Sequence, residues 1–240
     1  MYRQKIIYIP RLDMYIIKKG FSTRIGKKSL RGLNSSKTSE QQKRINDELA
    51  AERRAYQILN NFDARHDNGR EIVPGDWWIT LTYRRECKPC SLDEAHINLT
   101  KLFKKLRRKN KVFKFIGKTE DPGNGNYHHH IIISRDVSLD EIHRLWSEFS
   151  NHIEAKEIYN LSDMSLLDYF LKGAGTHKCK AAKYAASRNL EKPVVVVKII
   201  RAGHWKREPR PKRGYEVKDV QNYFDFFGFE AQKYIMRRLN

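Results

Sequence analysis

The chain has 240 residues, of which 40% are hydrophobic, so it can bury one sizeable globular core with appendages. Its 48 Lys and Arg residues against 28 Asp and Glu give a net charge of +20, which favours a polyanionic partner, most commonly nucleic acid. No segment reaches the roughly 18 apolar residues of a membrane span and no leader peptide opens the chain, so a membrane protein is not expected.

The first 70 residues are expected to form a basic arm followed by a helix. Short apolar runs lead into a stretch rich in Lys, Arg, Gly and Ser, residues 22–39, which is too polar to pack. A helix is predicted to begin after Thr38 or Ser39 and to continue to Phe62, with a somewhat irregular apolar stripe.

Strands and helices are predicted to alternate through the following residues. The predicted strands are 76–83, 111–120, 127–134, 152–159 and 193–201, the last preceded by a basic loop. The predicted helices are 91–109, 138–150 and 163–173. The first of these is capped by Ser91, with Glu94 at the capping-box position. The short Gly-rich turn at 121–126 joins two strands as a hairpin, so the sheet is at least partly antiparallel.

The predicted fold is therefore α+β, with a central, mainly antiparallel sheet, helices packed on one face and the other face free to hold a site. Three parts are expected along the chain. These are residues 1–70 as the basic arm and helix, 71–202 as the core, and 203–240 as a basic and aromatic extension.

The run "HHHIII" at 128–133 contains a candidate metal site. Alternation along a strand puts His128 and His130 on one face, about 7 Å apart along the backbone, and His129 on the other face with the isoleucines. Glu120 ends the preceding strand, and the short turn brings it beside His128. One carboxylate and two imidazoles suit Mn²⁺ or Mg²⁺ with positions left for water and phosphate, and they also suit zinc.

A candidate nucleophile lies on the predicted helix 163–173. Tyr169 and Lys172 are three residues apart and therefore share a helix face. A tyrosine oxygen can attack phosphorus when a metal polarises the phosphate, and a lysine can stabilise the developing charge. Tyr184 is a weaker candidate, interpreted as a packing residue beside a DNA contact at Arg188 and Asn189.

The motifs "WITLTY" (78–83), Glu120, "HHHIII" (128–133) and "YFLK" (169–172) resemble, in order and spacing, those of the HUH endonucleases. Among these, the chain is similar to the replication initiator (Rep) proteins of small phages and rolling-circle plasmids, over roughly residues 38–200. The resemblance implies that His128 and His130 are the paired metal ligands, Glu120 the third ligand and Tyr169 the nucleophile. This chain has His129 where the family usually has a hydrophobic residue.

The resemblance also implies a function: metal-dependent nicking and joining of single-stranded DNA at a replication origin, through a covalent 5′-phosphotyrosine. Host helicase and polymerase are the expected further partners. Two alternatives remain open, an HUH relaxase or single-strand transposase, and a non-catalytic protein that binds single-stranded nucleic acid on its sheet. DNA contacts are expected at Trp78, Thr80, Thr82, Lys118, Arg188 and Asn189.

The cysteine content bears on localisation. Only three cysteines occur, an odd number in a chain of this length, which argues against a disulfide framework and for a reducing compartment. We therefore expect the protein in the cytoplasm, and the resemblance makes this the cytoplasm of a bacterial host.

Overall fold

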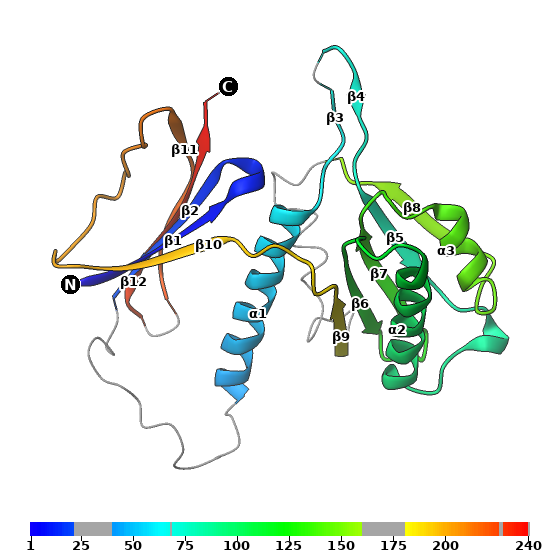
Figure 1. Ribbon diagram of the computed structural model, residues 1–240. Helices are drawn as coiled ribbons and strands as arrows, with labels where there is room; N and C mark the ends of the chain where they lie inside the picture. The colour runs from blue at the N-terminus through cyan, green and yellow to red at the C-terminus, as the bar shows by residue number, and fades with distance from the viewer. Residues whose placement is uncertain (22–39, 68, 160–180, 226–227, 240) are drawn as a thin grey trace. The chain divides into compact units, whose positions relative to one another are not determined.

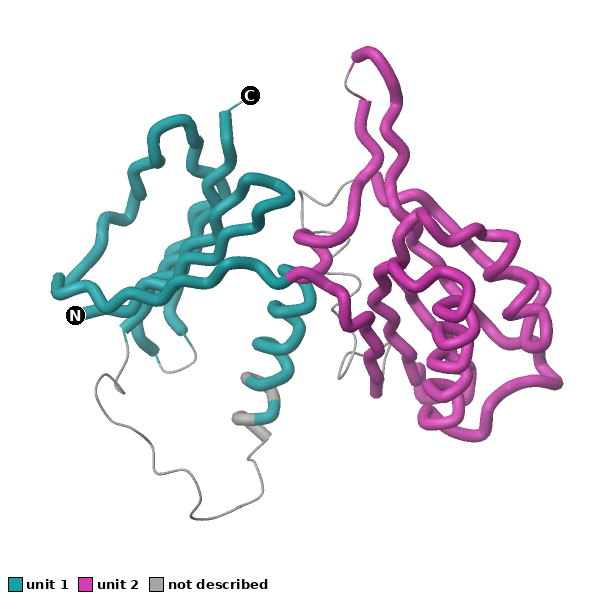
Figure 2. The backbone as a smooth tube through the Cα atoms, in the orientation of Figure 1, with its two compact units in different colours: residues 1–56, 192–240 teal, residues 57–191 magenta. Residues whose placement is uncertain are grey.

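The protein is an α+β structure with antiparallel sheets, as the sequence predicted (Figure 1). The structure, a computed structural model, describes residues 1–21, 40–67, 69–159, 181–225 and 228–239. The chain divides into two compact units, residues 1–56 with 192–240 (unit 1) and residues 57–191 (unit 2) (Figure 2). Within the described residues, no helix combines the length and the apolar composition that a membrane span requires.

Unit 2 contains a five-stranded antiparallel sheet in the order β8-β5-β7-β6-β9. Its strands are β5 (Trp77–Leu81), β6 (Phe115–Asp121), β7 (His128–Ile133), β8 (Ile153–Glu157) and β9 (Ala181–Ala186). Three of these strands, β5, β7 and β8, lie within predicted strands, and β6 extends one residue beyond its predicted end into Asp121. β9 lies in a stretch interpreted as a basic loop. Its Ala-rich sequence carries little strand propensity, and its pairing with β6 supplies the missing stabilisation.

Helices α2 (Leu92–Lys109) and α3 (Leu139–Trp146) cover one face of this sheet (Figure 1). Apolar side chains from alternate strand positions pack against the apolar stripes of both helices. The buried cluster comprises Ile79, Leu81, Leu99, Leu102, Phe103, Leu106, Phe113, Phe115, Ile131, Ile133, Val137, Ile142, Trp146 and Ile153. The expected arrangement, with helices on one face and a site on the other, follows from this packing.

Helix α2 begins at the predicted capping position. The Ser91 hydroxyl accepts a hydrogen bond from the Glu94 backbone N–H at 3.2 Å, and the Glu94 carboxylate accepts one from the Cys90 N–H at 2.7 Å. Arg107, Arg108 and Lys109 occupy the last turn, where positive charge favours the helix dipole.

The turn between β6 and β7 depends on glycine. Gly123 and Gly125 have φ values of 85° and 74°, a left-handed region that residues with a Cβ rarely adopt. These two positions let the chain reverse within six residues and bring the end of β6 next to the start of β7. The predicted hairpin is thereby confirmed.

Unit 1 contains a second five-stranded antiparallel sheet, in the order β10-β1-β2-β12-β11. Its strands are β1 (Tyr2–Ile9), β2 (Met14–Gly20), β10 (Val194–Ile200), β11 (Tyr215–Phe224) and β12 (Glu230–Arg238). Helix α1 (Glu40–Asn61), which matches its prediction, is tied to β2 by an ion pair between Glu52 and Lys18.

The sequence analysis missed this second sheet. It predicted β10 as a strand but placed it with the core at 71–202, whereas β10 pairs with β1 at the start of the chain. The contacts that stabilise such a sheet join residues far apart in the chain, and local periodicity does not report them. Outside the two large sheets, β3 (His66–Asp67) and β4 (Ile72–Val73) form a short two-stranded ribbon.

Gly117 of β6 lies directly beneath α2. A Cβ at this position would meet Phe103 Cζ at 3.0 Å and Leu99 Cδ2 at 3.1 Å, so these packed side chains would have to move to admit a larger residue. We expect Gly117→Val to lower the free energy of unfolding by about 1–3 kcal/mol, measured by urea denaturation. Gly20→Val is the control, because a Cβ at Gly20 meets no atom within 4 Å. Equal stability of the two variants would contradict this packing.

Candidate metal centre

Three donor side chains converge on the face of the unit 2 sheet opposite the helices. Glu120 lies directly across from His128 in the pairing of β6 with β7, and His130 is two residues further along β7. Glu120 Oε2 is 3.1 Å from His128 Nε2 and 3.8 Å from His130 Nε2. One ligand atom from each residue lies within 4.8 Å of the others, and among the described residues no other such group of three occurs.

These separations fit a single bound ion. With metal–ligand bonds of about 2.1 Å, two donors on one ion lie roughly 3.0–4.2 Å apart, depending on the angle between them. Both measured distances from Glu120 fall in this range. The three residues therefore form a group that could bind a metal ion with only small side-chain adjustments.

Both imidazoles are oriented by hydrogen bonds at their other ring nitrogen. His128 Nδ1 lies 3.2 Å from the Asn126 carbonyl oxygen, which can only accept, so this nitrogen carries the proton. His130 Nδ1 lies 3.3 Å from the Thr80 hydroxyl. Such partners fix the ring and direct Nε2 to the site, as at known metal centres. The sequence analysis missed Asn126, and singled out Thr80 only as a DNA contact.

The electrostatics of the cluster favour a cation. Burial alone would raise the pKa of Glu120, but the hydrogen bond from His128 and the nearby Lys118 ammonium lower it to about 2. Burial lowers the pKa of His130 to about 4, so this ring is neutral at pH 7, the form in which an imidazole binds a metal. The hydrogen bond to Glu120 raises the pKa of His128, so a metal would compete there with a proton.

Lys118 is placed differently from a surface DNA contact. Its side chain is fully buried, and its ammonium forms an ion pair with Oε1 of Glu120, the carboxylate oxygen other than the one nearest the histidines. The signal for this pairing was present in the sequence, because residues two apart on a strand share a face. Lys118 thus belongs to the site as the partner of the carboxylate.

His129 lies on the helix-covered face, as the alternation predicted. Its ring is fully buried, with Nδ1 3.0 Å from the Thr119 hydroxyl and Nε2 2.8 Å from the Tyr83 hydroxyl. Burial holds the pKa of His129 well below its usual value. Of the three consecutive histidines, this one has a structural role in the core beneath the helices.

The tryptophan and threonine candidates are near the site but differ in their roles. Trp78 is buried, with its ring centroid 5.8 Å from that of His130, while Trp77 packs on the helix side. Thr80 supports His130, as described above. The carbonyl of Thr82 accepts a hydrogen bond from the Trp146 indole at 2.9 Å and so helps to anchor α3.

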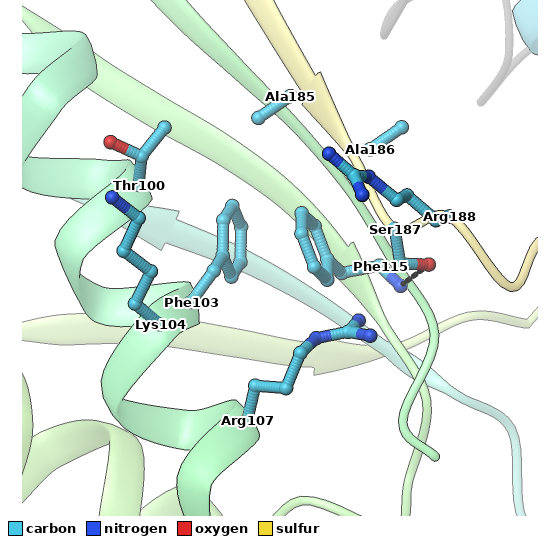
Figure 3. A pocket seen from close by; sticks show the side chains of 9 residues that line it. All are labelled: Thr100, Phe103, Lys104, Arg107, Phe115, Ala185, Ala186, Ser187 and Arg188. Carbon is cyan, nitrogen blue, oxygen red and sulfur yellow. Dashed lines mark hydrogen bonds between the residues drawn. The ribbon is translucent and has the colours of Figure 1, made fainter. Parts of the chain in front are cut away.

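Arg188 and Asn189 follow β9, away from the three donors. The Asn189 amide donates to the Val112 carbonyl at 2.7 Å and so holds the loop after α2. Arg188 is exposed and lines a cavity of about 570 Å³ between α2 and β9, together with Arg107 and Phe103 (Figure 3). None of the metal donors lines this cavity.

Of the two tyrosine candidates, the structure describes only Tyr184. Tyr169 and Lys172 lie outside the described residues. Tyr184 of β9 is half-buried and sits opposite Lys118 in the pairing of β6 with β9, which places it on the same face as Glu120 and His130. This register joins distant parts of the chain and has no local marker, which is why Tyr184 was interpreted as a packing residue.

Metal binding can be tested directly. The wild-type protein should bind one Mn²⁺, followed by electron paramagnetic resonance, and Glu120→Gln or His130→Ala should weaken binding at least about tenfold because each removes a donor. His143→Ala is the matched control, since His143 is an exposed histidine on α3. Unchanged binding in both site variants would refute the assignment.

His129 should make the fold sensitive to acid. Its pKa in the folded protein is depressed, so below the unfolded value of about 6.5 the unfolded chain takes up a proton that the buried ring does not, and stability falls as pH falls. In EDTA, His129→Gln should reduce the loss of unfolding free energy between pH 7.5 and 5.5 by about 1 kcal/mol. An equal loss in wild type and variant would show that the ring is protonated in the folded state.

Comparison with known protein families identifies a match over the central part of the chain. Residues 76–174 match a family model described as replication-associated protein ORF2, a range that spans the strands of the metal centre and reaches beyond Tyr169. No curated protein and no solved structure matches the chain. The family match supports a replication initiator role for the part of the chain that contains Glu120, His128 and His130.

Proposed function

We propose that this chain initiates DNA replication by nicking and rejoining single-stranded DNA at an origin, as a metal-dependent tyrosine endonuclease of the HUH class. The observation that carries the proposal is the convergence of Glu120, His128 and His130 on one sheet face, within residues that match a replication-associated family. Neither the three donor residues nor the family match suffices alone. Metal-binding triads serve many reactions, and a family match does not specify the chemistry.

The donor set suits the proposed chemistry. A bound Mn²⁺ or Mg²⁺ would polarise the scissile phosphate and offset its charge. The ionised Glu120 and the neutral His130 supply a hard oxygen and a nitrogen donor from one side only, which leaves room for a phosphate oxygen. Lys118 keeps the carboxylate oriented by binding its second oxygen.

Tyr169 is the proposed nucleophile, on the strength of the resemblance and of its place inside the matched range. Its phenol would lose a proton, attack the phosphorus and form a 5′-phosphotyrosine, while the bond to the 3′ oxygen breaks and leaves a 3′-OH. Lys172 would stabilise the developing negative charge. The phosphotyrosine conserves the phosphodiester energy, so strands can be rejoined without ATP.

The free 3′-OH defines the proposed partners. A host polymerase would extend it, and a host helicase would open the duplex ahead, in the cytoplasm of a bacterial host. A relaxase or a single-strand transposase would use the same chemistry, and the match to a replication-associated family favours initiation over both.

Tyr184 is a second candidate nucleophile, since its register puts it on the metal-binding face beside Lys118. Its position on β9, an edge strand of the sheet, differs from the helix position proposed for Tyr169. A test of the nucleophile must therefore treat the two tyrosines as a pair.

Tyr169→Phe should abolish both cleavage and the covalent adduct with single-stranded origin DNA in Mn²⁺, because it removes only the attacking oxygen. Lys172→Ala should slow cleavage, since it removes a charge and no bond to phosphorus. Denaturing gels would follow the adduct, and mass spectrometry would locate the modified peptide.

Tyr184→Phe is the matched comparison, with the same atom removed from the other tyrosine. A nucleotide found on Tyr184, or an undiminished adduct in Tyr169→Phe, would overturn the assignment of Tyr169. No adduct with any tested DNA, despite Mn²⁺ binding, would favour the non-catalytic alternative.

A further inference from the structure

The positive charge of the chain is concentrated in unit 1. Unit 1 contains 26 basic and 10 acidic residues, whereas unit 2, which carries the metal centre, contains 22 basic and 18 acidic residues. The net charges are therefore +16 and +4. The long-range attraction for a polyanion, which scales with this excess, belongs mainly to the unit outside the matched family region.

A basic loop between β10 and β11, residues 201–213, carries much of this charge in an exposed form. It is drawn in orange in Figure 1. Its only acidic residue is Glu208. The loop has six basic residues, all exposed: Arg201, Lys206, Arg207, Arg210, Lys212 and Arg213. Within the described part of the chain, none of them forms an ion pair with an acidic side chain.

The backbone of this loop is fixed to the unit 1 sheet. The buried Gln232 of β12 places its Nε2 3.0 Å from the Lys206 carbonyl and 2.9 Å from the Arg207 carbonyl. Trp205 packs edge-on against Tyr2 with ring centroids 5.1 Å apart. Because the backbone is held while the charged side chains face solvent, binding an anion would cost little ordering entropy in this loop.

A cavity of about 470 Å³ lies between this loop and the strands β11 and β12. Trp205, Tyr223 and Phe224 supply aromatic surface, and Arg207 supplies a cation. Phe224 is 71% exposed, so its ring offers a flat apolar surface to a ligand in this cavity. Glu230 also lines the cavity and would repel a phosphate from its own side.

We infer that unit 1 holds a binding site for single-stranded DNA, built entirely from its own residues. A base stacks on Phe224, which shares the loop-facing side of β11 with Asn222, and the flanking phosphates contact Arg207 and the neighbouring basic residues of the loop. Stacking requires an unpaired base, so the exposed ring favours single strands over duplex. The inference rests on the proposed function only in taking DNA as the partner.

The test measures binding alone, in EDTA, so that no cleavage contributes. In fluorescence anisotropy with a labelled oligothymidylate, Phe224→Ala should bind at least about fivefold more weakly than the wild type, in line with the loss of one stacked base. Arg207→Ala should also weaken binding and should reduce the slope of log affinity against log salt by about 0.7. Circular dichroism would establish that each variant is folded.

Two control variants match these changes within unit 1. Val220→Ala truncates another exposed apolar residue of β11, and Arg53→Ala removes an exposed charge from α1. Both should bind within about twofold of wild type.

Equal affinities of Phe224→Ala and Val220→Ala would overturn the stacking site, and so would duplex DNA bound as tightly as the oligothymidylate. Either result would leave the proposed nicking function standing, since nicking is read out separately through the Tyr169 adduct. Conversely, selective loss of binding in Phe224→Ala and Arg207→Ala would support this site even if no adduct forms.

Discussion

The register between β6 and β7 is the constraint on which the site depends. Glu120 lies opposite His128, and two-residue periodicity then puts His130 on the same face and His129 in the core. A slip of one residue would bury the two donor histidines and expose the third. The glycine turn at 121–126 sets this register, and the isoleucines after the histidines keep one face of β7 fixed in the core. The geometry of the candidate metal site and the packing of the sheet therefore both depend on the β6–β7 hairpin.

The two units differ in their net charge. Unit 2 is nearly balanced in charge, and many of its basic side chains pair with acids, as Lys105 does with Glu148 and Lys109 with Glu141. Most of the excess positive charge of the chain lies in unit 1.

Sequence reasoning succeeded where the signal is local. The cap of α2 at Ser91, the alternation of β7 and the β6–β7 turn each depend on a few consecutive residues, and all three were predicted. The unit 1 sheet was missed because β1 and β10 meet only in the folded chain. Lys118 was predicted only as a DNA contact. Lysine is rarely buried, and the ion pair with Glu120 explains why this one is. The roles of Tyr169 and Lys172 stay predictions.

The buried Lys118 also affects the stability of the protein when no metal ion is bound. A carboxylate enclosed in a sheet would destabilise the empty site, yet Lys118 already neutralises it. The carboxylate therefore has a charged partner that does not depend on an ion, so the cost of burying it does not oppose folding without metal. If the proposed activity needs a bound ion, the supply of divalent ions, and not the folding of the chain, would set when the site becomes competent.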